Sequence, residues 1–444
     1  MSDLMNIGAS GLRAYSRALS TVGDNIANAQ TAGYARRTVQ LREAPAAGDI
    51  VLSRNSIRPG GVEIAGLSRS VDSWLVDDAR TSSGDAGQAA SRLTWVSAAE
   101  RAIAEDGNGV DSRLTAIFTT ADELASNPGS TTLRQQFLLS VDEAATAFRQ
   151  TAGALTSAAR GVTDAARGEV YQLNTDLGAL ERVNAGLRRA RPGSSNEATL
   201  LDERDRLIDA VASRLPVTAN FDARGAATLR VAGSGDPLVV AGQVSTMSLN
   251  VAADGRLSFA LSPGGPASFT PASGSLAGLA DGARHISGLR SSLDSVANRL
   301  ASDLNAAHQS GFDANGNTGQ PLLAGVGAAA LVAVALAPED VAAADAASSN
   351  GNMLSLASLR GPSGVEQAWA GLANSQAQQT ASARAQDAAA SARYDGASAA
   401  RDAISEVDLD REAADLLRFQ QAYEAAARTI QVARETMQSV LNIF

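Results

Sequence analysis

Apolar residues at the beginning of the chain recur at alternating steps of three and four positions. The positions are Met5, Gly8, Leu12, Tyr15, Leu19, Val22, Ile26 and Ala29. Such steps place side chains on one line along an α-helix, and a seven-residue repeat of this kind is typical of a helix that packs against a partner helix. The pattern predicts an N-terminal helix that ends near residues 31–33, where Gly33 suits the left-handed conformation that follows many helices.

A second seven-residue repeat lies at the end of the chain. Its positions are Ala413, Leu416, Gln420, Tyr423, Ala427, Ile430, Arg434, Met437, Leu441 and Phe444. Asp408 is a suitable N-cap, and Asp410 and Glu412 fall in the first turn, where the helix dipole favours negative charge. Neither proline nor glycine interrupts residues 411–444, so we expect a helix about 50 Å long. Because each terminal helix needs an apolar partner, we expect the two to pair.

Between the two repeats, helical patterns alternate with other segments. The predicted helices span residues 90–126, 131–187, 198–215, 286–307 and 364–400. Residues 216–271 show short alternating stretches separated by turns, which predict a small antiparallel β domain, and residues 331–336 predict a further strand. We therefore expect a mainly α fold with an inserted all-β domain. The paired terminal helices form a coiled coil, the inner helices form a bundle, and the β domain lies at the far tip.

These patterns divide the chain into three expected domains. Residues 1–35 and 408–444 form the terminal coiled coil, residues 216–271 form the β domain, and residues 36–215 and 272–407 form the helical body, which starts with an extended connector over residues 36–89. One terminal pair buries little apolar area for the number of residues that it orders, so we expect neighbouring copies to contribute to its stability. The expected assembly interface is Leu12, Tyr15, Leu19, Val22, Ile26, Leu416, Tyr423, Ile430, Met437 and Leu441.

Composition narrows the chemistry that the chain can perform. The 444 residues carry 37 basic and 47 acidic side chains, and the net charge of −10 disfavours a nucleic-acid-binding surface. All basic residues are arginine and cysteine is absent, which excludes lysine Schiff bases, cysteine nucleophiles and cysteine-ligated metals. The most apolar run, residues 322–337, is short for a membrane span. We therefore expect a protein that is not an enzyme, has no cofactor, and binds neither nucleic acid nor a membrane.

Four local features resemble known sites, and each has a simpler interpretation. Residues 325–330 match a dinucleotide-binding glycine pattern but lack the preceding strand and following helix that such a site needs. Residues 313–319 resemble the start of a calcium loop without its glycine and final glutamate, so we expect a turn, with weak cation binding left open. Residues 202–206 form a charge cluster that we expect to face solvent. His308 would favour an enzyme only if carboxylates converged with it in a deep pocket. A membrane-active helical protein is a further alternative, which the acidic charge disfavours.

Both ends of the chain resemble the axial proteins of the bacterial flagellum, the family of rod, hook and junction subunits. The N-terminal signature of that family, approximately N-I-A-N-x-x-T-x-G-[YF], is matched in full by residues 25–34. The C-terminal signature corresponds to residues 407–410, 412–414 and 419–423. The motif residues are Asn25, Asn28, Thr31, Gly33, Tyr34, Gln420 and Gln421. The resemblance implies that Asn25, Asn28 and Thr31 set the register between subunits. The alternative is that they are ordinary polar residues at the end of a helix.

The interior resembles the members of this family that join the hook to the filament, on residues 125–128, 200–207 and 305–313. This resemblance implies a structural adaptor that is exported unfolded through the flagellar type III apparatus and assembles outside the cell as a ring at the hook tip. The implied partners are further copies of the chain, the hook protein below, the next hook–filament junction protein above, and a dedicated export chaperone on the C-terminal helix. A different axial subunit, from the distal rod or the hook, is the alternative.

Overall fold

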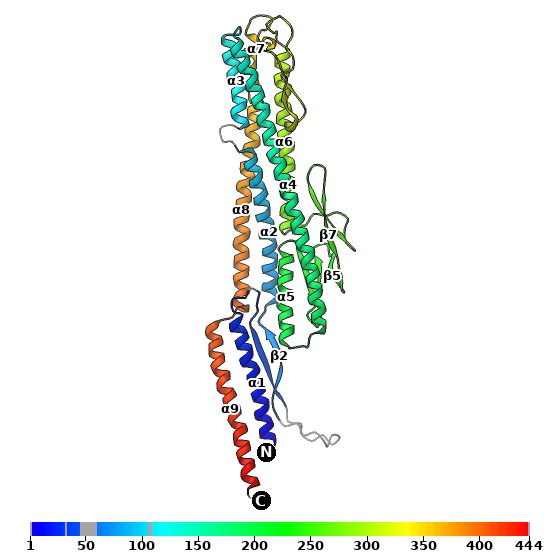
Figure 1. The fold of residues 1–444 in the computed structure, drawn as a ribbon, viewed down its shortest axis with the longest axis vertical. Helices are drawn as coiled ribbons and strands as arrows, with labels where there is room; N and C mark the ends of the chain where they lie inside the picture. Colours follow the sequence, from blue (N-terminus) through cyan, green and yellow to red (C-terminus); the bar gives the residue numbers. More distant parts are fainter. Residues whose placement is uncertain (1, 32, 45–59, 105–108, 443–444) are drawn as a thin grey trace.

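A computed structural model describes residues 2–31, 33–44, 60–104 and 109–442, and these form a long, mainly helical rod (Figure 1). The helices are α1 (Ser2–Ala27), α2 (Ser73–Ile103), α3 (Val110–Ser126), α4 (Thr131–Arg189), α5 (Ser195–Ala212), α6 (Ser275–Gln309), α7 (Gly351–Leu356), α8 (Val365–Ser405) and α9 (Leu409–Leu441), with 3-10 helices η1 (Ala328–Ala330), η2 (Pro338–Asp340) and η3 (Ala357–Arg360). The strands are β1 (Arg37–Ala44), β2 (Gly61–Arg69), β3 (Val217–Phe221), β4 (Ala227–Val231), β5 (Pro237–Val240), β6 (Gln243–Val244), β7 (Thr246–Val251), β8 (Leu257–Ser262), β9 (Leu323–Ala324) and β10 (Val332–Ala333). The predicted fold class, mainly α with small antiparallel sheets, is confirmed.

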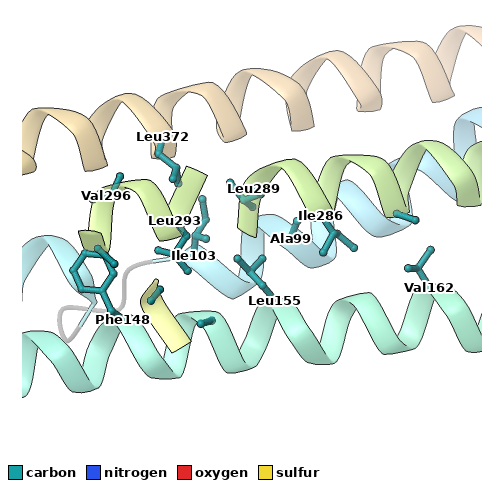
Figure 2. Packing of buried hydrophobic residues seen from close by; sticks show 14 of the residues in the cluster. Ala99, Ile103, Phe148, Leu155, Val162, Ile286, Leu289, Leu293, Val296 and Leu372 are labelled. Carbon is teal, nitrogen blue, oxygen red and sulfur yellow. The ribbon is translucent and has the colours of Figure 1, made fainter. Parts of the chain in front are cut away.

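The body of the rod is a bundle of long helices, α2, α4, α6 and α8, whose apolar faces meet in one core (Figure 2). Buried residues of α4 recur at helical spacing along its 59 residues, as expected for a helix with one face in the core. Phe148 of α4 meets Trp369 of α8 edge to face, with ring centroids 6.2 Å apart. The N-cap Ser130 accepts a hydrogen bond from the N–H of Leu133 and fixes where α4 begins. The body is thus held by continuous apolar packing.

Strands β3 to β8 lie on the flank of the body, beside α4 (Figure 1). Strands β3 to β6 form a four-stranded antiparallel sheet in sequence order, and β7 pairs with β8. Two asparagines of α4 hold these strands: Asn174 exchanges hydrogen bonds of 2.8 Å with both backbone groups of Met247, and Asn184 does the same with Ala227 at 2.7 and 2.9 Å. The strands therefore occupy the side of the rod instead of the expected tip, where α3, α7 and irregular segments lie.

The terminal helices α1 and α9 lie side by side in opposite directions and extend from the other end of the body, with the β1–β2 hairpin alongside α1 (Figure 1). Their contact uses small side chains, because a Cβ on Gly8 would lie 2.6 Å from Cγ1 of Ile430 and one on Gly11 would lie 3.4 Å from Cβ of Ala426. Ala14 and Ala18 are also buried on α1. Most of the buried positions of α1 therefore fall one residue before the predicted apolar positions. The small residues at these positions allow the backbones of the two helices to come close together.

Several predicted boundaries differ from the observed ones. The N-terminal helix ends at Ala27 instead of near residues 31–33, and Gly33 has a φ of +76° in the turn that follows. The predicted helix 90–126 is two helices, α2 and α3, and the expected connector holds the β1–β2 hairpin and the start of α2. The strand expected at residues 331–336 is reduced to β10, since only Val332 and Ala333 pair with β9. Phe444 lies outside the described residues. None of the described helices has an apolar stretch long enough to span a bilayer.

Candidate functional site at the base of the terminal helices

Asn25 of α1 is fully buried where the terminal helices meet the body. Its Nδ2 donates to the carbonyl oxygen of Arg37, at 2.9 Å, and to the carboxylate of Glu412, at 3.0 Å. Its Oδ1 accepts from the N–H of Arg37, at 3.0 Å, and from the hydroxyl of Tyr34, at 2.8 Å. All four hydrogen-bonding positions of the carboxamide are therefore used. One side chain thereby joins α1, β1, α9 and the segment after α1.

Tyr34 and Arg36 extend this set of contacts. Burial raises the pKa of Tyr34 to about 12, so its hydroxyl stays protonated and donates to Asn25 at neutral pH. Arg36 donates from Nε to Glu412 at 2.6 Å and from Nη2 to Asp415 at 3.2 Å. Its backbone N–H binds the carbonyl oxygen of Ser405, at 2.8 Å, just before α9. The residue just before β1 is therefore bonded both to α9 and to the end of α8.

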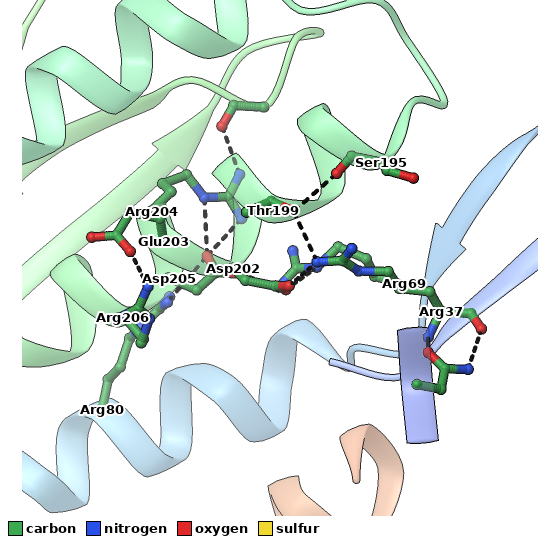
Figure 3. Close-up of polar contacts among 12 residues, drawn as sticks. Arg37, Arg69, Arg80, Ser195, Thr199, Asp202, Glu203, Arg204, Asp205 and Arg206 are labelled. Carbon is green, nitrogen blue, oxygen red and sulfur yellow. Dashed lines mark hydrogen bonds and ion pairs between the residues drawn. The ribbon is translucent and has the colours of Figure 1, made fainter. Parts of the chain in front are cut away.

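Carboxylates of α5 bind arginines from the hairpin and from α2 (Figure 3). Asp202 pairs with Arg37 at 2.6 Å and with Arg69 at 2.8 Å. Asp205 pairs with Arg69 at 2.8 Å and with Arg204 at 2.6 Å. Further along α5, Asp209 accepts from Nε of Arg80 at 2.7 Å. We call the following residues the junction cluster: Asn25, Arg36, Arg37, Arg69, Arg80, Asp202, Arg204, Asp205, Asp209 and Glu412.

This arrangement corrects the expectation that residues 202–206 form a solvent-facing charge cluster. Asp202 and Arg204 are only 6% and 7% exposed, and Arg204 also donates to the carbonyl oxygen of Gly225 at 2.6 Å. Glu203 and Arg206 do behave as expected: they form an ion pair with each other and are more exposed. The sequence interpretation failed for Asp202 because its arginine partners, Arg37 and Arg69, are more than 130 positions away.

Burial and pairing act in opposite directions on these charged groups. Burial alone would raise the pKa of Asp205, but Arg204 and Arg69 outweigh it and hold the pKa below its ordinary value. For Asp209, burial prevails over its pairing with Arg80 and raises the pKa. Burial also lowers the pKa of Arg204, although Asp205 opposes this effect. For these three groups, the opposite charges beside them offset part of the cost of burial.

The junction cluster replaces apolar packing at this point. Neither of the two clusters of buried apolar residues found among the described residues includes a member from α1, β1, β2 or α9. The terminal helices and hairpin are joined to the body through chain connections, hydrogen bonds and ion pairs, including Leu67 N–H to the carbonyl oxygen of Gly193 at 3.2 Å. The direction of the terminal pair relative to the body therefore depends on directional polar contacts.

Some of the residues predicted for the assembly interface lie between α1 and α9, and others lie on the outer surface of this helix pair. Val22 is buried, whereas Leu12, Tyr15, Leu19, Leu416 and Ile430 are half-buried. Ile26, Tyr423 and Met437 are exposed, and the side chain of Leu441 lies outside the described set. Other exposed large apolar side chains of α1 and α9 are Leu4, Ile7, Leu409, Leu417, Val432 and Val440.

The remaining motif residues lie near the surface. Asn28 donates to the carbonyl oxygen of Asp24 at 2.8 Å, and the hydroxyl of Thr31 donates to Asn28 at 3.3 Å. Gln420 and Gln421 are exposed on α9. Of the three residues expected to set the register between subunits, Asn25 thus makes its contacts within the chain, while Asn28 and Thr31 lie closer to the surface.

The other candidate sites do not assemble a reactive centre in the part of the chain that the structure describes. His308 is buried, with both ring nitrogens bonded to backbone groups. Asp313 accepts from the N–H groups of Asn315 and Asn317, both at 2.8 Å, which makes residues 313–317 a turn. No group of three histidine, aspartate or glutamate side chains among the described residues is arranged to hold a metal ion.

Three family models match successive parts of the chain. The model described as the flagellar hook-associated protein FlgK helical domain matches residues 96–323, which is half of the chain. The model of the C-terminal part of the flagellar basal body rod protein FlgEFG matches residues 402–443, and that of the flagella basal body rod protein matches residues 5–34. The last two matches contain α9, most of α1 and the whole N-terminal motif.

Curated relatives and one solved structure are similar over large parts of the chain. Flagellar hook-associated protein 1 of Salmonella typhimurium is 26% identical over 72% of this chain, and that of Bacillus subtilis is 25% identical over 97% of it. The matched region spans 59% of the length of the Salmonella protein and 96% of the Bacillus protein. The flagellar hook junction protein FlgK of Burkholderia pseudomallei is 20% identical with a TM-score of 0.49, covering 56% of this chain and 46% of that one.

Proposed function

Because the chain belongs to the FlgK family of flagellar hook-associated proteins, we propose that it is a structural subunit, not an enzyme, that joins the flagellar hook to the filament. It is exported unfolded and assembles as a ring of copies at the tip of the hook, outside the cell. Its neighbours are the hook protein below and the next hook–filament junction protein above. An export chaperone binds the C-terminal helix before assembly.

The observation that carries this proposal is the unpartnered apolar surface of the paired terminal helices. Leu417 and Val432 of α9 are 60% and 61% exposed, and apolar side chains of this size gather at protein–protein interfaces when they lie close together on a surface. The seven further members of this set, which we call the terminal apolar set, are Leu4, Ile7, Ile26, Leu409, Tyr423, Met437 and Val440. Copies that pack side by side through these residues would bury them in the wall of a tube.

The junction cluster supports the same function by fixing how the terminal pair leaves the body. A ring closes only if every copy presents its contact surfaces at the same angle. Asn25 and Glu412 define that angle within each chain. Asn28 and Thr31 lie nearer the surface, where contact with a neighbouring copy is open to them. We keep the division into residues 1–35 with 408–444, 36–215 with 272–407, and 216–271 as the proposed domains.

A distal rod or hook subunit is the weaker alternative. The rod-protein models match only the two ends of the chain, residues 5–34 and 402–443. The body, which distinguishes one axial subunit from another, matches the FlgK helical domain.

A deletion strain tests the function directly. Cells without this protein should keep their hooks, fail to build filaments and release flagellin monomers into the medium. Expression of the wild-type chain should restore the filaments, whereas the double variant Leu417→Asp with Val432→Asp should not, although its secretion and its helix content are unchanged. The matched control is Gln431→Asp, an exposed polar position on the same helix. Filaments of normal length in the double variant would contradict the proposed interface, and a deletion strain without hooks would favour the alternative.

A further inference from the structure

His308 lies in the last turn of α6 and is fully buried. Its Nδ1 is 2.6 Å from the carbonyl oxygen of Gln320, and its Nε2 is 2.9 Å from the backbone nitrogen of Ala342. A carbonyl oxygen can only accept a hydrogen bond, and a backbone N–H can only donate one. The two contacts therefore require the neutral ring, with its proton on Nδ1 and a free electron pair on Nε2.

The two partners of His308 belong to one irregular stretch, residues 311–344, which we call the distal segment. Its regular structure is limited to the two-residue strands β9 and β10 and the 3-10 helices η1 and η2. Side chains of the neighbouring helices hold its backbone: Asn305 binds Leu322 and Leu323, and Arg149 binds the carbonyl oxygen of Leu331 at 2.6 Å. His308 joins two parts of the segment that are 22 residues apart, from Gln320 to Ala342.

We propose that His308 is a pH-sensitive switch that keeps the distal segment closed on α6 at neutral pH and releases it when the ring gains a second proton. A proton on Nε2 would point at the N–H of Ala342, so that two donors would face each other. The ring is fully buried, so it cannot turn out into water, and the backbone of Gly319 packs so closely on it that a Cβ there would lie 2.8 Å from Nδ1. The charged ring and the closed segment are therefore incompatible.

No ionised partner offsets this conflict within the described residues. Arg134 of α4, the cation that binds the segment beside Ala342, donates to the carbonyl oxygen of Val341 at 2.6 Å and offers the ring no negative charge. Other charged side chains of the surrounding elements are bonded elsewhere: Arg149, Asp294, Asp313, Asp340 and Asp345 all bind backbone groups. Burial lowers the pKa of His308, and the hydrogen bond to Gln320 opposes this only in part.

The direction of the pH effect follows from linkage. In the open segment the imidazole titrates near its ordinary value of about 6.5, whereas in the closed segment its pKa is lower. The open state therefore binds the proton first. Above about pH 6.5 the ratio of closed to open segment is constant, and below it the ratio falls about tenfold per pH unit until the pKa of the closed state is reached.

Amide hydrogen exchange on the full-length chain tests this switch. Protection factors, corrected for the intrinsic pH dependence of exchange, should fall by up to about fivefold in residues 311–344 between pH 6.5 and 5.5 and stay constant in the middle of α4. His308→Gln offers a donor and an acceptor that do not titrate, so the fall should disappear. His285→Gln is the matched control, because His285 is the second of the chain's two histidines and binds Gln376 instead of the distal segment.

A second measurement on the wild-type chain does not depend on how well the variant folds. The imidazole signals of the two histidines, assigned with the His285→Gln variant, are followed by NMR from pH 8 to 4.5. The titration midpoint of His308 should lie below about 6.5 and coincide with the loss of protection in the distal segment. A switch is excluded if the segment keeps its protection while His308 becomes charged, or if the acid response persists in His308→Gln. Either result would leave the assembly role untouched, because both concern the isolated chain.

Discussion

The body of the molecule and the base of its terminal helices are held together by opposite means. In the body, Phe148, Trp369 and their neighbours form one continuous apolar core along α2, α4, α6 and α8. At the base of the terminal helices, the contacts are those of the junction cluster, in which carboxylates and arginines are buried against one another. Apolar packing tolerates small shifts, whereas ion pairs and amide hydrogen bonds require one geometry. The body therefore supplies stability, and the base supplies direction.

The largest effect of a substitution is expected in the apolar core of the body. Phe148→Ala should lower the free energy of unfolding by about 3–5 kcal/mol, because it leaves a cavity beside Trp369 that the helices cannot close. Urea denaturation followed by tryptophan fluorescence measures this change. Leu139→Ala, at a position on the same helix that is 55% exposed, is the control and should change the free energy by less than about 1 kcal/mol. Similar losses for both variants would contradict a core at this place.

Removing Glu412 should have the next largest effect, and it should be local. Glu412→Ala removes the acceptor of Nε of Arg36 and one of the two acceptors of Nδ2 of Asn25, which leaves a buried guanidinium only partly paired and costs about 3 kcal/mol. Amide exchange should therefore become faster in α1 and β1, while α4 keeps its protection. The control is Glu424→Ala, an exposed position on the same helix. An equal loss of protection in the body would show that the base and the body unfold as one unit.

The sequence predicted the elements that depend on local periodicity and missed those that depend on distant partners. The N-cap Asp408 and the long helix α9 were expected, since apolar spacing and capping residues are local signals. The pairing line of α1 was misplaced by about one residue, because the side chains that make closest contact are glycine and alanine, which carry little apolar signal.

The junction cluster was the larger omission. Glu412 was assigned to the helix dipole, although its partners Arg36 and Asn25 lie at the opposite end of the chain. The sequence alone does not show whether a charged side chain is buried. Its burial depends on which groups of opposite charge the fold brings to it. The one available signal was the full N-terminal motif, whose Asn25 and Tyr34 bond to each other at 2.8 Å. The position of the β strands beside α4 likewise depends on Asn174 and Asn184, whose role no periodic pattern indicates.

Asp202 allows a milder test of how the hairpin is held. Asp202→Asn keeps the shape of the side chain but leaves Arg37 and Arg69 without their shared charge, so we expect a local loss of about 1–3 kcal/mol. Because the chain contains no cysteine, two can be introduced for spin labels, at Glu63 on β2 and at Glu203 on α5. The distance distribution between the labels should broaden in the variant. Asp164→Asn, from an exposed ion pair on α4, should leave the distribution unchanged.

The smallest effect is expected at an ion pair on the same hairpin that faces solvent. Arg42 and Glu63 lie 2.8 Å apart, a distance equal to that between Arg69 and Asp202, yet their side chains are 64% and 55% exposed. Water screens this pair and hydrates either partner alone, so Glu63→Gln should change stability by less than about 0.5 kcal/mol. Amide exchange in β1 and β2, measured beside that of Asp202→Asn, gives the comparison. If the two variants destabilised the hairpin equally, burial would not be the reason for the strength of the junction cluster, and the direction of the terminal pair would have to be set by the chain connections alone.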